Sequence, residues 1–227
     1  MWAVYKKELK TYFLSPIGYV AVGLFLFFYS VFFFLTTIDY GAVDLGNLYY
    51  AAARYGLLLI VPILTMRTFA EERKTGTEQL FLTSPRSITS IVLGKFWAAV
   101  TVIFITTIAS LMYFAIISFF AKANIVTVLV AMAGFLLLGM AAVSFGMLAS
   151  SITENQIIAG IITIAFLVVP WFLVEISDVF SIINLMDSFM KFPSGLISIT
   201  DIVSLVSFTV MCLLLTILFM KRRKTVK

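Results

Sequence analysis

The chain has 227 residues, of which 62% are apolar and only 12% are charged. This composition excludes an ordinary soluble domain, in which about a quarter of the residues are charged, and it indicates a membrane protein. The net charge of +5 comes from lysines and arginines that stand beside apolar runs, where they indicate membrane topology rather than nucleic-acid binding.

The first sixteen residues predict an amphipathic helix. Its apolar positions share one helical face and its lysines lie elsewhere around the axis. Such a helix lies along the inner membrane surface, and Pro16 breaks it before the first span. The apolar positions are Trp2, Tyr5, Leu9, Tyr12 and Phe13, and the lysines are Lys6, Lys7 and Lys10.

Apolar runs then predict an all-α membrane protein with six transmembrane helices, each near the length of about 20 residues that crosses a bilayer. Pro62 in the second span and Pro170 in the fifth are expected to kink their helices. The spans are Ile17–Ile38, Tyr49–Phe69, Phe96–Phe120, Ile125–Ser150, Ile157–Val174 and Ile202–Met220.

The basic residues predict that both termini are cytoplasmic, because Lys and Arg are retained on that side. With the N-terminus inside, thirteen of the sixteen basic residues fall on the cytoplasmic side, and only Arg54, Lys122 and Lys191 fall on the other. The thirteen are Lys6, Lys7, Lys10, Arg67, Arg73, Lys74, Arg86, Lys95, Lys221, Arg222, Arg223, Lys224 and Lys227.

The loop between spans 2 and 3, residues 67–86, is the most distinctive polar stretch. Thr75 and Glu78 have the spacing of a capping box, which predicts a short helix from about Gly76. Leu80, Phe81 and Leu82 give this helix an apolar patch, Ser84-Pro85 ends it, and Ser87 can cap the helix that enters span 3. The result is a cytoplasmic knob that could dock a soluble partner. The alternative is a solvated loop whose charges only anchor the topology.

The loop between spans 4 and 5 is short, and Thr153 and Gln156 again have capping-box spacing. Before it, span 4 carries a stripe of small residues that permits close helix packing. The stripe consists of Gly139, Ala142, Gly146, Ala149 and Ser150.

The segment 175–201 is apolar in patches, yet it contains Asp178, Asp187 and Lys191. A seventh span here would bury these charges at about 2.5 to 3.5 kcal/mol each, and it would place the basic C-terminus outside. We therefore expect short helices that dip into the outer leaflet, followed by a turn at Pro193 and Gly195.

Enzyme chemistry is not indicated. Without histidine there is neither a Ser-His or Cys-His pair nor a His-Glu-x-x-His zinc site. Gly94-Lys95 matches the end of a phosphate-binding loop, but Thr89 stands where the first glycine is required and Phe96 where Ser or Thr is required. The spans also carry no ionisable residue in their interior, which argues against proton-coupled carriers, ion pumps and charge-ringed channels.

Three segments resemble the type-two ABC exporter permeases, and within them the compact bacterial subgroup that includes the gliding-motility permeases. They are Glu71–Leu80 with Gly94-Lys95, Ser151–Gln156, and the N-terminal helix that ends in Ser15-Pro16. The resemblance implies one transmembrane domain over residues 1–227. Within it, residues 1–16 would be an interfacial connecting helix, 67–90 the coupling-helix loop, and 175–201 an outer re-entrant segment.

The resemblance also implies the partners. Two copies of the chain would pair, and two ABC ATP-binding subunits would dock beneath them with ATP and Mg, while this chain would hold no cofactor or metal. ATP-driven closure of these subunits would push the coupling helices. The implied contact residues are Glu71, Glu72, Arg73, Lys74, Thr75, Gly76, Thr77, Glu78 and Leu80.

The implied translocation pathway would include Tyr55, Thr65, Thr163 and Trp171. A pathway without buried charge suits an amphiphilic or hydrophobic cargo, first an amphipathic peptide or toxin, exported across the bacterial plasma membrane. The sequence does not decide whether the chain pairs with a second copy of itself or with a different permease. A stand-alone channel or secondary carrier would transport when purified alone, and a non-transporting membrane scaffold is the other alternative.

Overall fold

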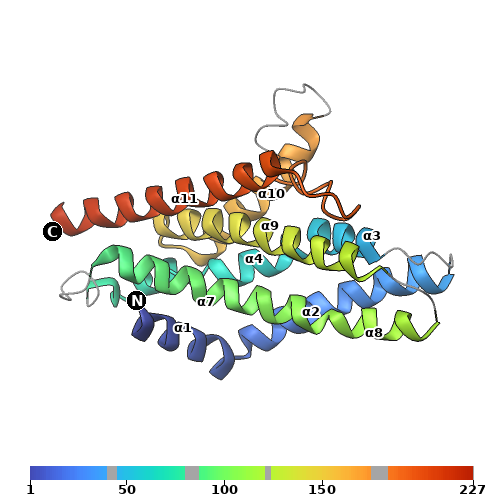
Figure 1. Ribbon diagram of the computed structural model, residues 1–227. Coiled ribbons are helices and arrows are strands. Elements are labelled where there is room, and N and C mark those ends of the chain that lie inside the picture. Colours follow the sequence, from blue (N-terminus) through green and yellow to red (C-terminus); the bar gives the residue numbers. More distant parts are fainter. Residues whose placement is uncertain (40–44, 80–86, 121–123, 175–183, 227) are drawn as a thin grey trace.

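The computed structural model describes residues 1–39, 45–79, 87–120, 124–174 and 184–226, and these form helices and turns without a strand. Within them, five helical passages are long and apolar enough to cross a membrane, and the apolar helix Gln156–Phe172 is shorter. Both termini lie at the same end of the bundle (Figure 1). We call it the basic end, after the lysines and arginines predicted there.

The N-terminal helix α1, Trp2–Leu14, is followed directly by α2, Pro16–Phe33, and by a π-helical turn η1, Phe34–Asp39. Ser15 is extended and Pro16 is the first helical residue of α2, a position that tolerates its missing N–H, so the predicted break is confirmed. Helix α1 packs along α7, where Tyr5 shares a hydrogen bond of 3.1 Å with the Thr101 hydroxyl. Its place relative to the membrane surface stays a prediction.

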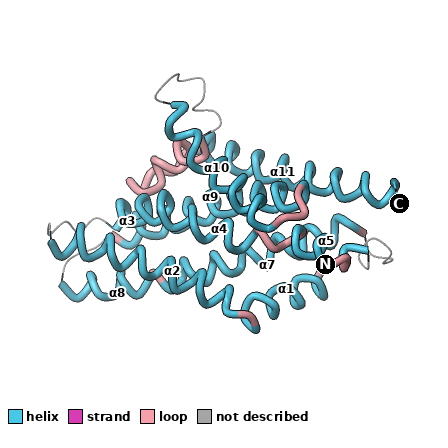
Figure 2. The backbone as a smooth tube through the Cα atoms, turned by 180° about the vertical axis from the view of Figure 1, so that it is seen from behind, coloured by secondary structure: helices cyan, strands magenta, loops and turns pink. Residues whose placement is uncertain are grey.

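The second passage consists of α3, Leu45–Ala51, a π-helical turn η2, Ala52–Gly56, and α4, Leu57–Thr65. It begins four residues before the predicted span 2 and returns the chain to the basic end. After a turn at 66–69 comes the short helix α5, Ala70–Lys74. Figure 2 shows α5 at the same end of the bundle as the N-terminus.

The third passage is α7, Ile88–Ala109, continued after Ser110 by α8, Leu111–Phe120. Ser87 caps α7 as predicted, since its hydroxyl accepts a hydrogen bond from the Ser90 N–H at 3.3 Å. The helix starts eight residues before the predicted span 3. Lys95 therefore lies inside the helix, and its charge is paired within the protein.

The remaining helices are α9, Ile125–Ile152, α10, Gln156–Val174, and α11, Ile199–Val226. Helix α10 begins where it was predicted, but Asn155 rather than Thr153 caps it. The side-chain oxygen Oδ1 of Asn155 accepts a hydrogen bond from the Ile157 N–H at 2.9 Å. Pro62 and Pro170 lie inside α4 and α10.

Helix α9 is the centre of the bundle and contacts α4, α7, α10 and α11. The small residues of its stripe face other helices closely, as predicted. A Cβ on Gly139 would lie 3.1 Å from Ile103, and one on Gly146 would lie 2.2 Å from the Thr65 hydroxyl. Glycine at these two positions therefore lets the side chains of the neighbouring helices pack directly against the backbone of α9.

The outer segment differs in part from its prediction. Residues 175–183 lie outside the described residues, and 184–195 form successive turns rather than regular helices. Phe189 and Phe192 from these turns are buried, with Phe192 against Gly134 of α9. The predicted turn before α11 is confirmed at Gly195, whose φ of +76° favours glycine.

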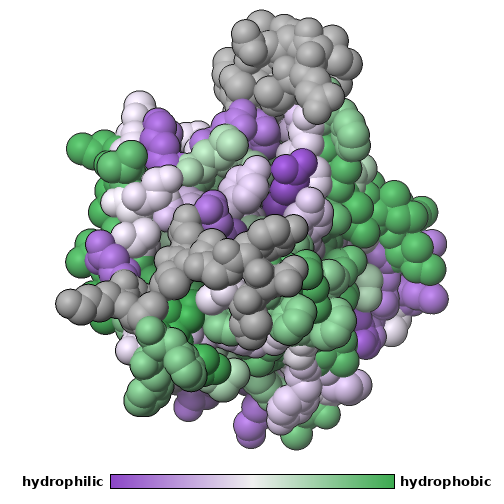
Figure 3. Space-filling model, turned by 90° about the vertical axis from the view of Figure 1, so that its right-hand side faces the viewer, coloured by the Kyte–Doolittle hydropathy of each residue, from purple (hydrophilic) through white to green (hydrophobic). Residues whose placement is uncertain are grey.

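Large apolar side chains are exposed on the outward faces of α10 and α11, for example Ile157, Phe172 and Leu214. Figure 3 looks onto the end opposite the basic end, where polar residues gather in the upper part of the view and large apolar patches lie to the right and below. Apolar patches of this kind suit a protein surrounded by lipid.

Candidate functional site

The candidate site is the cluster of charged residues at the basic end, and Lys95 of α7 is at its centre. Lys95 is buried, and its Nζ donates to Glu72 Oε1 of α5 at 2.7 Å, to Glu8 Oε1 of α1 at 3.3 Å and to the Thr68 carbonyl at 2.9 Å. A buried ammonium is tolerated only when paired and hydrogen-bonded. One lysine therefore ties α1, α5 and α7 together.

Arg73 connects α5 to two other helices. Its guanidinium donates to the carbonyls of Ser151 at 2.9 Å and Ile152 at 3.1 Å, which end α9. A cation is favourable at a helix C-terminus, where unpaired carbonyls collect. Arg73 also lies 3.5 Å from Glu78, and Glu78 lies 3.6 Å from Arg223 of α11.

Glu71 pairs with Arg67, in the turn that precedes α5. Both of its carboxylate oxygens accept from Arg67 at 2.6 Å, a bidentate pair one helical turn apart. Glu72 and Arg73 thus join the knob to different helices, whereas Glu71 makes a partly exposed pair within the knob.

Lys74, Thr75, Gly76 and Thr77 form the exposed tip of the knob. Gly76 has a φ of +74°, a conformation that side chains disfavour, and it separates α5 from the residues that follow. Thr75 closes α5, since its hydroxyl donates to the Glu71 carbonyl at 2.9 Å. The predicted capping box of Thr75 and Glu78 is therefore wrong: Thr75 ends one helix instead of starting the next.

The predicted contact residues fall into two groups as a result. Glu72, Arg73 and Glu78 hold the knob to the bundle and Glu71 pairs with Arg67 inside the knob, whereas the tip is exposed. Leu80 lies outside the described residues, as does most of the predicted helix from Gly76 to Leu82.

Ser150 of α9 fastens the start of α5. Its buried hydroxyl accepts from the backbone N–H groups of Phe69 and Ala70, each at 3.1 Å, and donates to the Met66 carbonyl at 3.1 Å. A small-residue position predicted only for packing thus supplies the cap that α5 lacks in its own sequence.

We expect Ser150→Ala to lower the free energy of unfolding by about 1 to 3 kcal/mol, because two buried N–H groups lose their acceptor. Ser151→Ala is the matched control, since its hydroxyl donates only to the Leu148 carbonyl of its own helix. Thermal unfolding of the purified variants in detergent measures both. Equal stability of the two variants would contradict the capping role.

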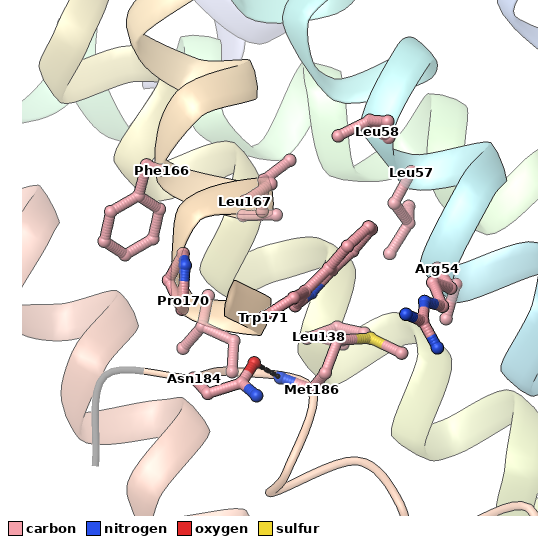
Figure 4. A pocket seen from close by; sticks show the side chains of 13 residues that line it. Arg54, Leu57, Leu58, Leu138, Phe166, Leu167, Pro170, Trp171, Asn184 and Met186 are labelled. Carbon is pink, nitrogen blue, oxygen red and sulfur yellow. Dashed lines mark hydrogen bonds between the residues drawn. The ribbon is translucent and has the colours of Figure 1, made fainter. Parts of the chain in front are cut away.

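The predicted pathway residues also separate into two pairs. Thr65 and Thr163 are fully buried, and their hydroxyls donate to Val61 and Ala159 of their own helices, so neither reaches the surface in this structure. Tyr55 and Trp171 both lie beside the guanidinium of Arg54. From the sequence alone, Arg54 was used only to assign the topology. Figure 4 shows the guanidinium of Arg54 pointing toward the Trp171 ring.

Sequence reasoning missed Glu8, Lys95, Ser150 and Arg54 as functional candidates. A lone glutamate amid lysines in α1 was one signal, because Glu8 lies one turn from Val4, which packs against Gly94. Lys95 directly follows that glycine, so the pattern could have suggested that α1 crosses α7 there. Nothing in the sequence indicates that Ser150 would cap a helix eighty residues away.

The apolar passages define a multi-pass helical membrane protein, and the knob is fastened at its basic end. A family model described as "ABC-2 family transporter protein" matches residues 40–221. The chain therefore belongs to the ABC-2 transporter family and is a transmembrane subunit of an ABC transporter, a kind of subunit that works with an ABC ATP-binding subunit. A comparison with curated proteins finds no match.

Proposed function

We propose that the chain is the permease of an ATP-driven exporter in the bacterial plasma membrane, with both termini cytoplasmic and α10 as the sixth span. Two copies pair and bind two ATPase subunits, which hold ATP and Mg. The cargo is amphiphilic or hydrophobic, with an amphipathic peptide or toxin as the first candidate. The segment from α5 through the tip acts as the coupling element.

One observation carries this proposal: the exposed tip is joined to the bundle by charged contacts in several directions. Glu72 pairs with Lys95 of α7, which also pairs with Glu8 of α1. Arg73 donates to the end of α9 and pairs with Glu78, which in turn pairs with Arg223 of α11. A solvated loop that only marks topology needs none of these buried pairs. A coupling element needs them, because force applied at its tip must reach the spans without being lost in local bending.

The test is a charge reversal at the tip, Lys74→Glu. It leaves the buried pairs intact, so we expect unchanged thermal stability and at least a tenfold loss of ATPase subunit in co-purification, on the order of the 1.4 kcal/mol that separates tenfold steps in affinity. Ser194→Glu is the control, since it adds a negative charge at an exposed position near the opposite end. If the Lys74→Glu variant recruits the ATPase subunit fully, the tip is not part of the docking surface.

A further inference from the structure

Arg54 lies deeper in the membrane-spanning part of the protein than its sequence position indicates. The second passage starts at Leu45, nine residues before Arg54, which corresponds to roughly 13 Å of helix. Arg67 lies thirteen residues further along, or roughly 20 Å, toward the basic end. Arg54 thus lies away from both ends of this helical passage, whereas the sequence predicts no charge in the interior of the spans.

The surroundings of Arg54 are aromatic rather than acidic. Its guanidinium carbon lies 4.9 Å from the centre of the Trp171 ring and 5.9 Å from that of Tyr55, and one N–H reaches the Tyr50 hydroxyl at 3.4 Å. Among the described residues, no carboxylate lies within ion-pair distance of it. A guanidinium has five N–H donors, so most of them stay available to an anion.

The local backbone presents this side chain. Arg54 is the central residue of the π-helical turn η2, and such wide turns occur mostly at functional positions. Tyr55, the next residue, is 43% exposed and stacks on Phe32 of α2 at 5.4 Å between ring centres. The turn thus holds a cation and an aromatic ring at a partly open surface between α2 and α10.

A pocket continues from Arg54 toward the basic end. Arg54, Trp171 and Asn184 form its polar part, and Leu57, Leu58 and Leu167 are among its apolar walls (Figure 4). Its free volume is about 20 Å³, room for one water molecule, so a larger group enters only when α4 and α10 separate. A charge at one end and an apolar lining at the other match the two parts of an amphiphile.

We propose that Arg54 and Trp171 bind the anionic group of an amphiphile, a phosphate or a carboxylate that carries an apolar chain. An arginine inside a membrane-spanning helix is costly without a counter-charge, which no described residue supplies, and its two aromatic neighbours offset only part of that cost. An anion completes the pairing, and Arg favours phosphate and carboxylate because its N–H groups match their geometry. That this ligand is the exported substrate rests on the proposed function, whereas the binding itself does not.

Trp171 allows a direct test, because the chain has only three tryptophans. With Trp2→Phe and Trp97→Phe in place, Trp171 is the sole tryptophan and reports on quenching by amphiphiles with a brominated chain. Three probes share that chain: a fatty acid, a lysophosphatidic acid and an uncharged maltoside. Quenching by the fatty acid identifies a carboxylate ligand, and quenching by the lysophosphatidic acid identifies a lipid-type phosphate.

We expect at least one anionic probe to quench Trp171 at about tenfold or more lower concentration than the maltoside, and Arg54→Gln to remove that difference, as loss of a charged hydrogen bond predicts. Arg54→Lys should restore part of it. Lys191→Gln, which removes an exposed cation elsewhere, should change nothing.

Equal quenching by all three probes, or unchanged selectivity in a folded Arg54→Gln variant, would overturn the site. Co-purification of the ATPase subunit with the wild-type chain separates the two proposals. A wild-type chain that recruits ATPase but shows no anion selectivity contradicts only the amphiphile site, and a wild-type chain that never recruits ATPase contradicts the exporter.

Discussion

Lys95→Met is expected to destabilise the protein by about 3 to 5 kcal/mol, the cost of leaving a buried ion pair without one partner. Glu72 would lose the ammonium 2.7 Å from its carboxylate, and Glu8 would keep only Lys7 at 3.7 Å. The Thr68 carbonyl would lose its donor as well. The loss should appear as a lower unfolding temperature in detergent, together with detachment of α1, measured by faster proteolysis of the N-terminal residues.

A second substitution separates the charge from the packing. Lys95→Met with Glu72→Met replaces the pair by apolar groups of similar length, which is often neutral relative to the original pair. The double variant should therefore be more stable than Lys95→Met alone. If both variants unfold at the same temperature, the unpaired carboxylate is not the cause of the loss.

Gly146→Ala is the second substitution with a large expected effect. The new Cβ would lie 2.2 Å from the Thr65 hydroxyl and 2.8 Å from its Cβ, between two helices that cannot move apart without disturbing their other contacts. Overpacking of this kind costs about 1 to 3 kcal/mol. The unfolding temperature should fall, and Gly146→Val should lower it further.

Gly160→Ala of α10 is the matched control, because its nearest neighbour, Met66, would be at 3.8 Å, an ordinary contact. Here the better helix propensity of alanine should dominate, with a gain of up to about 1 kcal/mol. Adding Thr65→Gly to Gly146→Ala should recover part of the lost stability. Failure of this rescue would show that the crowding at Gly146 does not come from Thr65.

The sequence predicts the passages well because membrane-spanning helices depend on long apolar runs, which are a local property. The break at Pro16, the cap at Ser87 and the turn at Gly195 were also found, since each depends on one residue and its immediate neighbours. The surroundings of two charged residues within these helices were not predicted, because they depend on contacts with other helices: Lys95 lies within α7, and Arg54 lies in the second passage.

The arrangement of side chains in the candidate site could not be predicted from the sequence. The motif from Glu71 to Glu78 located the knob, yet the direction of each side chain depends on contacts with α1, α7, α9 and α11. Glu72 faces inward because Lys95 lies there, and Arg73 does so because α9 ends beside it. Such pairings join positions far apart in the sequence, and no local spacing encodes them.

The contacts of α9 have a mechanical consequence. Ser150 and Arg73 fasten its end to α5, and Gly146 leaves no free space between its backbone and Thr65 of α4. The polar contacts join α9 to α5 and the steric contact joins α9 to α4, so the three segments form one packed unit. In the proposed coupling role, a displacement at the tip would tilt this unit as a whole.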